Sequence, residues 1–306
     1  MVAIDIASSI IFISQTGVGS LGNSIVLALY IFTFFTGHRL KPLDLLITHL
    51  AFVNNVVLLS KGIPQTIAAF GFKNFLNDNS CKLIFYFHRV ARSLSLCTTC
   101  LLSGFQTIII NSKSIRMANF RSRMPKLSIL FCFLCWALSL LINSNILVHI
   151  KGPTESRNVT ERWELIYCSS FNISSHIPIF SIMASVLDLV CMGIMVWTSG
   201  STVLILYRHH QQTQYILCKH FTPGCAPETR ATQIILLLVS MFVSFYMFNS
   251  IMVWYIRFFK PSLWFVHTSV FLSACFPACS PYVWIMGNSQ ILRDCVASWQ
   301  RIKLLS

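Results

Sequence analysis

The chain has 306 residues and a mass of 34.7 kDa; 55% of its residues are hydrophobic, only 10% are charged, and its formal net charge is +14. Soluble domains carry about 25% charged residues, so this composition excludes a water-soluble enzyme, a disordered chain and a collagen-like fibre. Charge this dilute in so apolar a chain also argues against a nucleic-acid partner. It favours a protein of the lipid bilayer, in which excess Lys and Arg mark cytoplasmic loops.

A transmembrane helix needs about 20 mostly apolar residues. Seven segments of the chain meet this requirement, and they predict an all-α membrane protein with a seven-transmembrane-helix bundle over residues 1–286 and a cytoplasmic tail over 287–306. The predicted spans, in chain order, are residues 9–35, 44–70, 81–110, 127–150, 177–206, 231–256 and 264–286. The first apolar run has no basic segment before it and is too long for a cleaved signal peptide, so we expect an uncleaved signal anchor.

The distribution of basic residues predicts the orientation of the bundle. Lys and Arg concentrate in the loops after the first, third and fifth spans and in the tail, which the positive-inside rule assigns to the cytoplasm. A multi-pass protein of the plasma membrane with an extracellular amino terminus follows. Two glycosylation sequons, at Asn158 and Asn172, both lie in the loop assigned to the outside. Asn158 is the better acceptor, because Asn172 lies close to the fifth span.

Most of the twelve cysteines lie within apolar spans or in segments that face the reducing cytoplasm. Only Cys81, at the outer start of the third span, and Cys168, in the second outer loop, remain in an oxidising compartment, and we predict a disulfide between them. Two Cys-x-x-Cys pairs lie in the third and fourth spans. No His or carboxylate completes a ligand set beside them, so we interpret these cysteines as packing residues and expect no metal site.

The tail contains apolar residues at helical spacing between positions 290 and 304, opposite Arg293 and Asp294. This pattern predicts an amphipathic helix that lies at the membrane interface. Cys295 on this helix is either a palmitoylation site or an unmodified cysteine.

Ionisable side chains inside a membrane span are costly and commonly face a cavity, a partner or a pathway. At about 1.5 Å per residue, the four such side chains lie about 12–16 Å from the outer ends of their spans, in one layer. Two polar neighbours complete the set, which comprises Lys61, Gln65, His88, Arg89, Arg92 and Asp188. One interpretation is the floor of an outward-opening pocket, whose basicity favours an acidic or hydrogen-bond-accepting organic ligand. The alternative is an interhelical lock, in which Asp188 pairs with an arginine and never meets a ligand.

The sequence contains no recognisable catalytic motif and no glycine-rich phosphate loop, so we expect neither an enzyme nor a bound cofactor. A membrane channel or transporter is an alternative. It is less favoured, because seven spans do not divide into inverted repeats and no ring of acidic residues lines a path.

Several segments in the same order resemble the vomeronasal type-1 receptors, a family of G-protein-coupled receptors, and the resemblance covers nearly the whole chain. In the second span they are HLAFVNN from His49 and LSKGIPQT from Leu59, followed by AFG from Ala69. Later segments are KNFLND from Lys73, CKLIFYFHRV from Cys81, TTCLLS from Thr98, PETRATQ from Pro227, ILLLVS from Ile235, FVSFY from Phe242, Phe276-Pro277 and Ser280-Pro281. The Asp-Arg-Tyr of the broader rhodopsin-like class is absent, and QTIII stands in its place from Gln106.

The resemblance implies a pheromone-type chemosensory receptor that binds a small organic ligand and activates an inhibitory-class heterotrimeric G protein. A bitter-taste-type receptor and a folded chain that no longer signals are alternatives. Basic residues near the inner ends of the fourth and sixth spans either border the G-protein cleft or only set orientation and attract lipid headgroups. These residues are Arg121, Arg123, Lys126 and Arg230.

Overall fold

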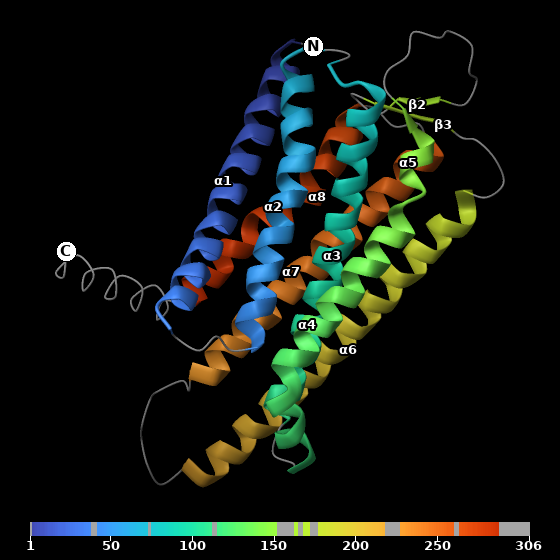
Figure 1. Ribbon diagram of the computed structural model, residues 1–306. Helices are drawn as coiled ribbons and strands as arrows, with labels where there is room; N and C mark the ends of the chain where they lie inside the picture. Colours follow the sequence, from blue (N-terminus) through green and yellow to red (C-terminus); the bar gives the residue numbers. More distant parts are fainter. Residues whose placement is uncertain are drawn as a thin grey trace.

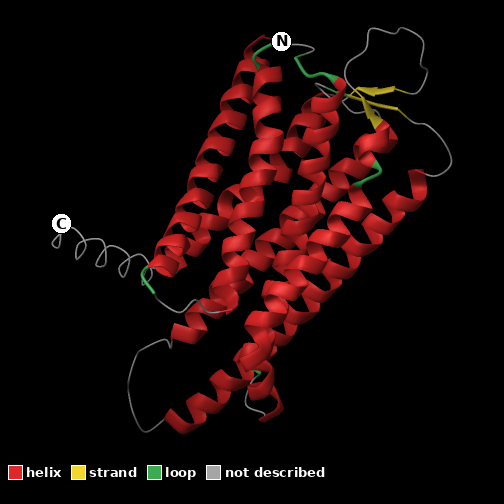
Figure 2. Ribbon diagram, in the orientation of Figure 1, coloured by secondary structure: helices red, strands yellow, loops and turns green. Residues whose placement is uncertain are grey.

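Long helices make up nearly all of the described part of the computed structural model (Figures 1 and 2). The structure describes residues 2–37, 42–72, 75–111, 115–151, 162–164, 168–171, 177–217, 227–259 and 263–287. The helices are α1 (Val2–Phe35), α2 (Pro42–Ala69), α3 (Asp78–Ile110), α4 (Ile115–Asn143), α5 (Ile146–His149), α6 (Ile177–Leu217), α7 (Pro227–Phe259) and α8 (Leu263–Gly287). Three short strands complete the fold: β1 (Ile150–Lys151), β2 (Arg162–Glu164) and β3 (Ser169–Phe171).

Seven of the described helices are long and apolar enough to cross a membrane, which confirms the predicted number of spans. They are every helix except the single-turn α5. Figure 1 shows that they run alternately up and down, so α1 begins at the end of the bundle that carries the strands and α8 ends at the other. The predicted extracellular amino terminus and the division at residue 286 remain predictions.

The fourth predicted span, residues 127–150, extends further than the helix that the structure forms there, because α4 ends at Asn143. The Nδ2 atom of Asn143 donates to the carbonyl of Ser139 at 2.8 Å, and the Oγ of Ser144 donates to the carbonyl of Leu141 at 2.7 Å. Side chains that bond to nearby carbonyls compete with the helical ladder. The chain therefore turns at residues 144–145 and continues as α5 and β1.

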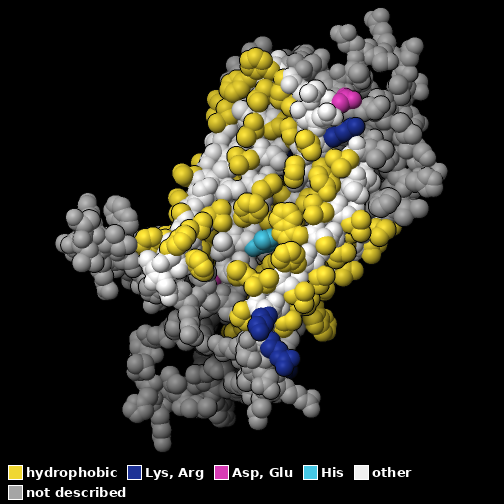
Figure 3. Space-filling view, viewed as in Figure 1, with side chains coloured by type: hydrophobic (Ala, Val, Ile, Leu, Met, Phe, Trp, Pro, Cys, Tyr) yellow, Lys and Arg dark blue, Asp and Glu magenta, His cyan; other side chains and the backbone are white. Residues whose placement is uncertain are grey.

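Helix α3 lies at the centre of the bundle, where it packs against α2, α4, α6 and α7, while α1 packs against α2 and α8. Of the hydrophobic stretch in α3, 56% of the residues are buried, against 11% in α4. The outward faces are apolar (Figure 3); side chains such as Phe133 and Trp197 are 72% and 78% exposed. Such an exposed apolar surface suits contact with lipid rather than water.

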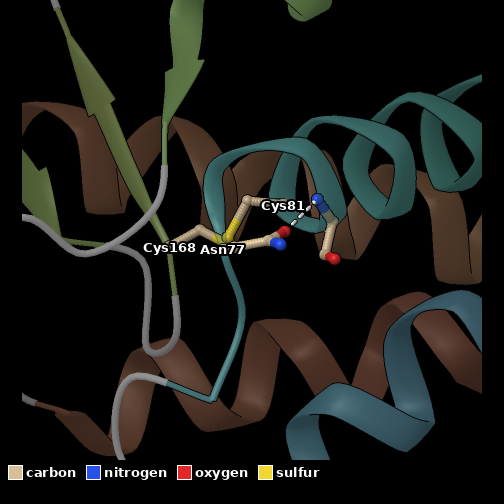
Figure 4. Close-up of a disulfide and its surroundings, with 4 residues drawn as sticks. Asn77, Cys81 and Cys168 are labelled. Carbon is tan, nitrogen blue, oxygen red and sulfur yellow. Dashed lines mark hydrogen bonds between the residues drawn. A yellow bond between two sulfur atoms is a disulfide. The ribbon is translucent and has the colours of Figure 1, made fainter.

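A disulfide fastens the strands to the first turn of α3. Cys168, directly before β3, is bonded to Cys81, with the two Cα atoms 6.0 Å apart (Figure 4). This is the pair that the sequence singled out. Asn77 caps the helix there, because its side chain accepts a hydrogen bond from the backbone N–H of Ser80 at 2.9 Å. β3 is the middle strand and pairs antiparallel with β1 and β2. The disulfide therefore holds the sheet over one end of the bundle.

Two prolines in α8, Pro277 and Pro281, interrupt its backbone hydrogen bonds where α1 packs against it. Pro281 has no N–H, so the carbonyl of Pro277 loses its helical donor. The Nδ2 atom of Asn23 in α1 takes that place at 2.8 Å, and it also bonds to the carbonyl of Gly19 within its own helix at 2.8 Å. Asn23 is only 1% exposed. Prolines are tolerated in membrane helices when a neighbour satisfies the freed group in this way.

Three predictions fall on residues outside the described ranges. They are the two sequons, at Asn158 and Asn172, and the interfacial helix that carries Cys295.

Candidate functional site

Two neighbouring cavities in the half of the bundle nearer the sheet are lined by four of the six residues of the predicted polar layer. The first lies between α2, α3, α7 and α8, and Arg92 lines it. The second is smaller and lies between α1, α2, α3 and α8, and Lys61, Gln65 and His88 line it. The residues that the sequence placed in a single layer therefore line two separate cavities where they line a cavity at all.

The first cavity has mainly aromatic and aliphatic walls, with Arg92 as its one charged lining residue. The guanidinium carbon lies 4.9 Å from the centroid of the Tyr246 ring, a cation–π arrangement. In the amide orientation that satisfies both its ends, Asn249 accepts from Nη2 of Arg92 at 3.1 Å and donates to Ser269. The remaining lining residues are Val57, Ser95, Phe242, Phe245, Leu272, Ser273, Phe276 and Pro277.

Asp188 on α6 is not among the residues that line either cavity. Its Oδ2 atom accepts a hydrogen bond from the hydroxyl of Tyr246, whose ring lies against Arg92. Asp188 also interacts electrostatically with Arg92 and Arg89. Tyr246 therefore contacts residues from both interpretations of the polar layer. Arg92 lines a cavity, as the pocket interpretation expects, and Asp188 links α6 to α7 through Tyr246, as the lock interpretation expects.

Arg89 faces away from both cavities and its side chain is exposed. Each helical residue is rotated by about 100° from the one before it. His88 and Arg92, four residues apart, therefore share the inward face of α3, and Arg89 turns outward. Arg89 therefore lines neither cavity, while its electrostatic interaction with Asp188 is compatible with the predicted interhelical lock, which remains a prediction.

The second cavity contains the amino group of Lys61 and the amide of Gln65, one helical turn apart on α2. The Nζ atom of Lys61 donates to Oγ of Ser273 on α8 at 3.0 Å. Gln65 is 2% exposed, and its Nε2 atom has no hydrogen-bond partner among the described residues. His88 is buried beside them, with Nδ1 3.3 Å from Oγ of Ser60. Two donors therefore line one cavity.

Several lining residues were not predicted from the sequence. Phe242, Phe245, Tyr246 and Asn249 recur on α7 at intervals of three, one and three residues, so they lie on one face of that helix. This spacing was a usable signal. Ser273 gave no signal, because its role depends on the approach of Lys61 from another helix.

The basic residues assigned to the G-protein face lie on α4 and α7. Arg123 and Lys126 are exposed. Arg121 and Arg230 lie in described helical backbone, while the positions of their side chains fall outside the described part of the structure.

The cysteines of the third and fourth predicted spans pack in the bundle interior. Cys97 and Cys100 belong to the main hydrophobic core with Cys191, and Cys132 and Cys135 pack against it. Within the described ranges, no group of three or more His, Cys, Asp or Glu side chains is placed to hold a metal ion.

The chain is similar to known membrane receptors in both sequence and fold. The model of the vomeronasal organ pheromone receptor family matches residues 6–297. Vomeronasal type-1 receptor 1 of Homo sapiens is 42% identical over 95% of this chain and 83% of its own length, and vomeronasal type-1 receptor 4 of Homo sapiens is 40% identical over 94% and 96%. The crystal structure of squid rhodopsin superposes with a TM-score of 0.73, covering 99% of this chain and 87% of rhodopsin, at 18% identity. The likeness to rhodopsin shows the fold alone.

Proposed function

Because the chain belongs to the vomeronasal organ pheromone receptor family, we propose that it binds a small organic ligand in the first cavity and activates an inhibitory-class heterotrimeric G protein. Family and fold make it a multi-pass membrane receptor of the chemosensory G-protein-coupled type. The ligand site and the class of G protein are the parts that we propose.

In this proposal the end of the bundle with the disulfide faces the outside of the cell. The excess of Lys and Arg in the opposite loops supports this orientation. An oxidising outer compartment also suits the Cys81–Cys168 bridge. Asn158 is then the favoured glycosylation site, Asn172 the lesser one, and Cys295 a candidate for palmitoylation on the cytoplasmic side.

The single observation that carries the ligand site is the placement of Arg92 in an otherwise largely apolar cavity. Small-molecule sites are typically concave, mostly apolar and supplied with a few polar groups that orient the ligand. The aromatic walls would hold the body of an organic molecule, and Arg92 would donate to an acceptor on it. A small odorant or pheromone-like compound fits this chemistry.

The contacts of Arg92 suggest how binding reaches the rest of the bundle. Arg92 on α3 meets Tyr246 and Asn249 on α7, Tyr246 bonds to Asp188 on α6, and Asn249 bonds to Ser269 on α8. A ligand that draws the guanidinium toward itself changes its contacts to α7 directly, and it changes the bonds to α6 and α8 through Tyr246 and Asn249. Such a ligand shifts the receptor between two packings only as far as it binds them with different affinity.

At the inner end, we propose that the basic residues border the surface that receives the G protein. Exposed positions at Arg123 and Lys126 are compatible with this role, and Arg121 and Arg230 belong to the same proposed face. Reversal to Arg123→Glu with Lys126→Glu should reduce G-protein activation at unchanged surface expression, whereas attraction of lipid headgroups alone would leave activation intact.

The decisive experiment is expression in cells with a G-protein activation reporter, screened against volatile and steroid-like libraries. We expect activation that disappears in cells lacking inhibitory-class α subunits. Arg92→Ala should raise the half-maximal concentration of an activating compound by roughly 10–100-fold, since hydrogen bonds to charged groups contribute about 1.5–3 kcal/mol. Arg89→Ala, which changes an outward-facing arginine on the same helix, is the matched control. Verified surface expression without any signal, or a ligand-dependent ion current without functional G protein, would contradict the proposal.

A further inference from the structure

The second cavity contains a cation, Lys61, that has no acid partner among the residues the structure describes. Within the described residues, Lys61 has one hydrogen-bond partner, the hydroxyl of Ser273, and no carboxylate partner. That hydroxyl donates its own hydrogen to the carbonyl of Val270 at 2.6 Å. The charged group that acts electrostatically on Lys61 is Arg92, another cation. An ammonium group inside a membrane protein is costly unless an opposite charge or several acceptors compensate it.

A second donor lines the same cavity without a partner. Gln65 lies four residues after Lys61, so the two side chains share one face of α2. Gln65 is 98% buried, since only 2% of its surface is exposed, and no described atom accepts from its Nε2. Buried donors in native structures nearly always have an acceptor, so an unpaired one beside an uncompensated cation indicates a group that binds there.

The second cavity also adjoins the first. Val57 and Ser273 line both, so the two cavities share part of their walls between Lys61 and Arg92. Gln15, Thr16 and Phe12 of α1 close the far side of the second cavity. A molecule that places a polar head at Lys61 can therefore extend its apolar body toward the aromatic walls of α7.

We propose that this second cavity binds the carboxylate of an organic acid, with one oxygen on Lys61 and the other on Gln65, while the apolar body of the acid occupies the first cavity. The ligand class of the receptor is then a hydrophobic monocarboxylate. The two donors match the two oxygens and the single negative charge of that group. This inference rests on the proposed function, because it names the chemistry of the ligand that the receptor binds.

Binding is tested on the full-length receptor, purified and held in lipid nanodiscs, without any G protein. The probes are 4-phenylbutanoate and 3-phenylpropanoate, each paired with its methyl ester, and the readout is the thermal unfolding midpoint as a function of probe concentration. We expect the acids to raise the midpoint saturably and the esters to do so at least tenfold more weakly. Lys61→Met should abolish this preference, Lys61→Arg should retain it, and Gln65→Leu should weaken it.

Arg89→Met is the matched control, because it removes a cation that lines neither cavity, and it should leave the preference for acids unchanged. If Lys61→Met does not fold, Gln65→Leu and Ser273→Ala carry the test. Equal effects of acid and ester, or no saturable effect of either acid on the folded receptor, would overturn the inference.

A G-protein assay separates this inference from the proposed function. Saturable binding of the acid without G-protein activation would reject the proposed function and leave the carboxylate site standing. Activation by a neutral compound with the same potency in the wild type and in Lys61→Met, together with no saturable effect of either acid, would reject the carboxylate site and leave the receptor function standing.

Discussion

At the scale of single residues, polar side chains in this bundle act across helices. Asn23 satisfies a carbonyl that a proline frees in α8, Lys61 crosses from α2 to Ser273, and Tyr246 joins the carboxylate of Asp188 to the ring contact with Arg92. In lipid a polar group that loses its partner finds no water to replace it. Each of these contacts therefore ties together two or more helices that are distant in the sequence.

Asn23→Leu should destabilise the receptor, because the carbonyl of Pro277 then has neither a helical nor a side-chain donor. The expected loss is about 1–2 kcal/mol in the free energy of unfolding. Thermal unfolding of the purified protein in detergent measures it. Asn55→Leu is the matched control, since Asn55 donates across helices only to Ser24, at 3.3 Å. Equal losses in the two variants would show that the proline carbonyl does not depend on Asn23.

Tyr246→Phe removes the hydroxyl that donates to Asp188 and leaves the ring beside Arg92 in place. A hydrogen bond to a charged group contributes about 1.5–3 kcal/mol, so stability should fall by that order. Chemical denaturation in detergent, repeated in an Asp188→Asn background, isolates the pair in a double-mutant cycle. Tyr86→Phe, whose hydroxyl bonds to a neutral carbonyl, should cost less. An unchanged cost of Tyr246→Phe in the Asp188→Asn background would rule out an energetic link to Asp188.

At the scale of elements, the contact of α1 with its neighbours depends on small residues. A Cβ atom at Gly19 would lie 2.8 Å from both the Cα of Ala278 and a methyl group of Leu58, and one at Gly22 would meet Pro281 and Tyr282 of α8 at 2.9 Å. Membrane helices gain little from excluding lipid, so close backbone approach through small residues drives much of their packing. α1 can therefore reach α8 closely enough for Asn23 to bond there.

Gly19→Ala should separate α1 from α8 and cost about 1–3 kcal/mol, the usual range for an overpacked contact. Gly17→Ala, two residues earlier, is the control, because a Cβ there meets nothing within 4 Å. It should be neutral or stabilising by up to about 1 kcal/mol, since Ala is the better helix former. The measurement is the unfolding midpoint of each variant, which should be lower for Gly19→Ala than for Gly17→Ala. Comparable midpoints would mean that α1 and α8 tolerate a wider spacing.

At the scale of the whole molecule, the Cys81–Cys168 bridge spans 87 residues of sequence and closes a large part of the chain into one loop. It links the first turn of α3, the central helix, to the sheet that lies over the same end of the bundle. Both cavities lie in that half of the bundle. The bridge is thus placed to hold together the end of the bundle that is nearer the two cavities.

Cys168→Ser should lower stability by up to about 4–5 kcal/mol, the chain-entropy value for closing a loop of this length. Surface expression and the unfolding midpoint should both fall. Cys279→Ser, at an exposed free cysteine, should change stability by less than about 0.5 kcal/mol. A Cys168→Ser receptor with the stability and surface expression of the wild type would contradict a stabilising role for the bridge.

Much of this protein was predictable because its strongest constraints are local. A membrane span requires a long apolar run, so the apolar runs along the chain were enough to determine the number of spans. The cytoplasm keeps thiols reduced, so the placement of cysteines along the chain was enough to select Cys81 and Cys168. Ordered segments of family sequence identified the receptor class without any coordinates.

Only the tertiary structure decided which side of each helix faces inward. In a soluble helix an apolar stripe marks the buried face, but the lipid-facing side of a membrane helix is as apolar as the side that packs. The rotation of each helix about its axis is therefore set by contacts between distant segments. That rotation turned Arg89 outward and Arg92 inward, brought Ser273 to Lys61, and placed four residues of the predicted polar layer in two separate cavities.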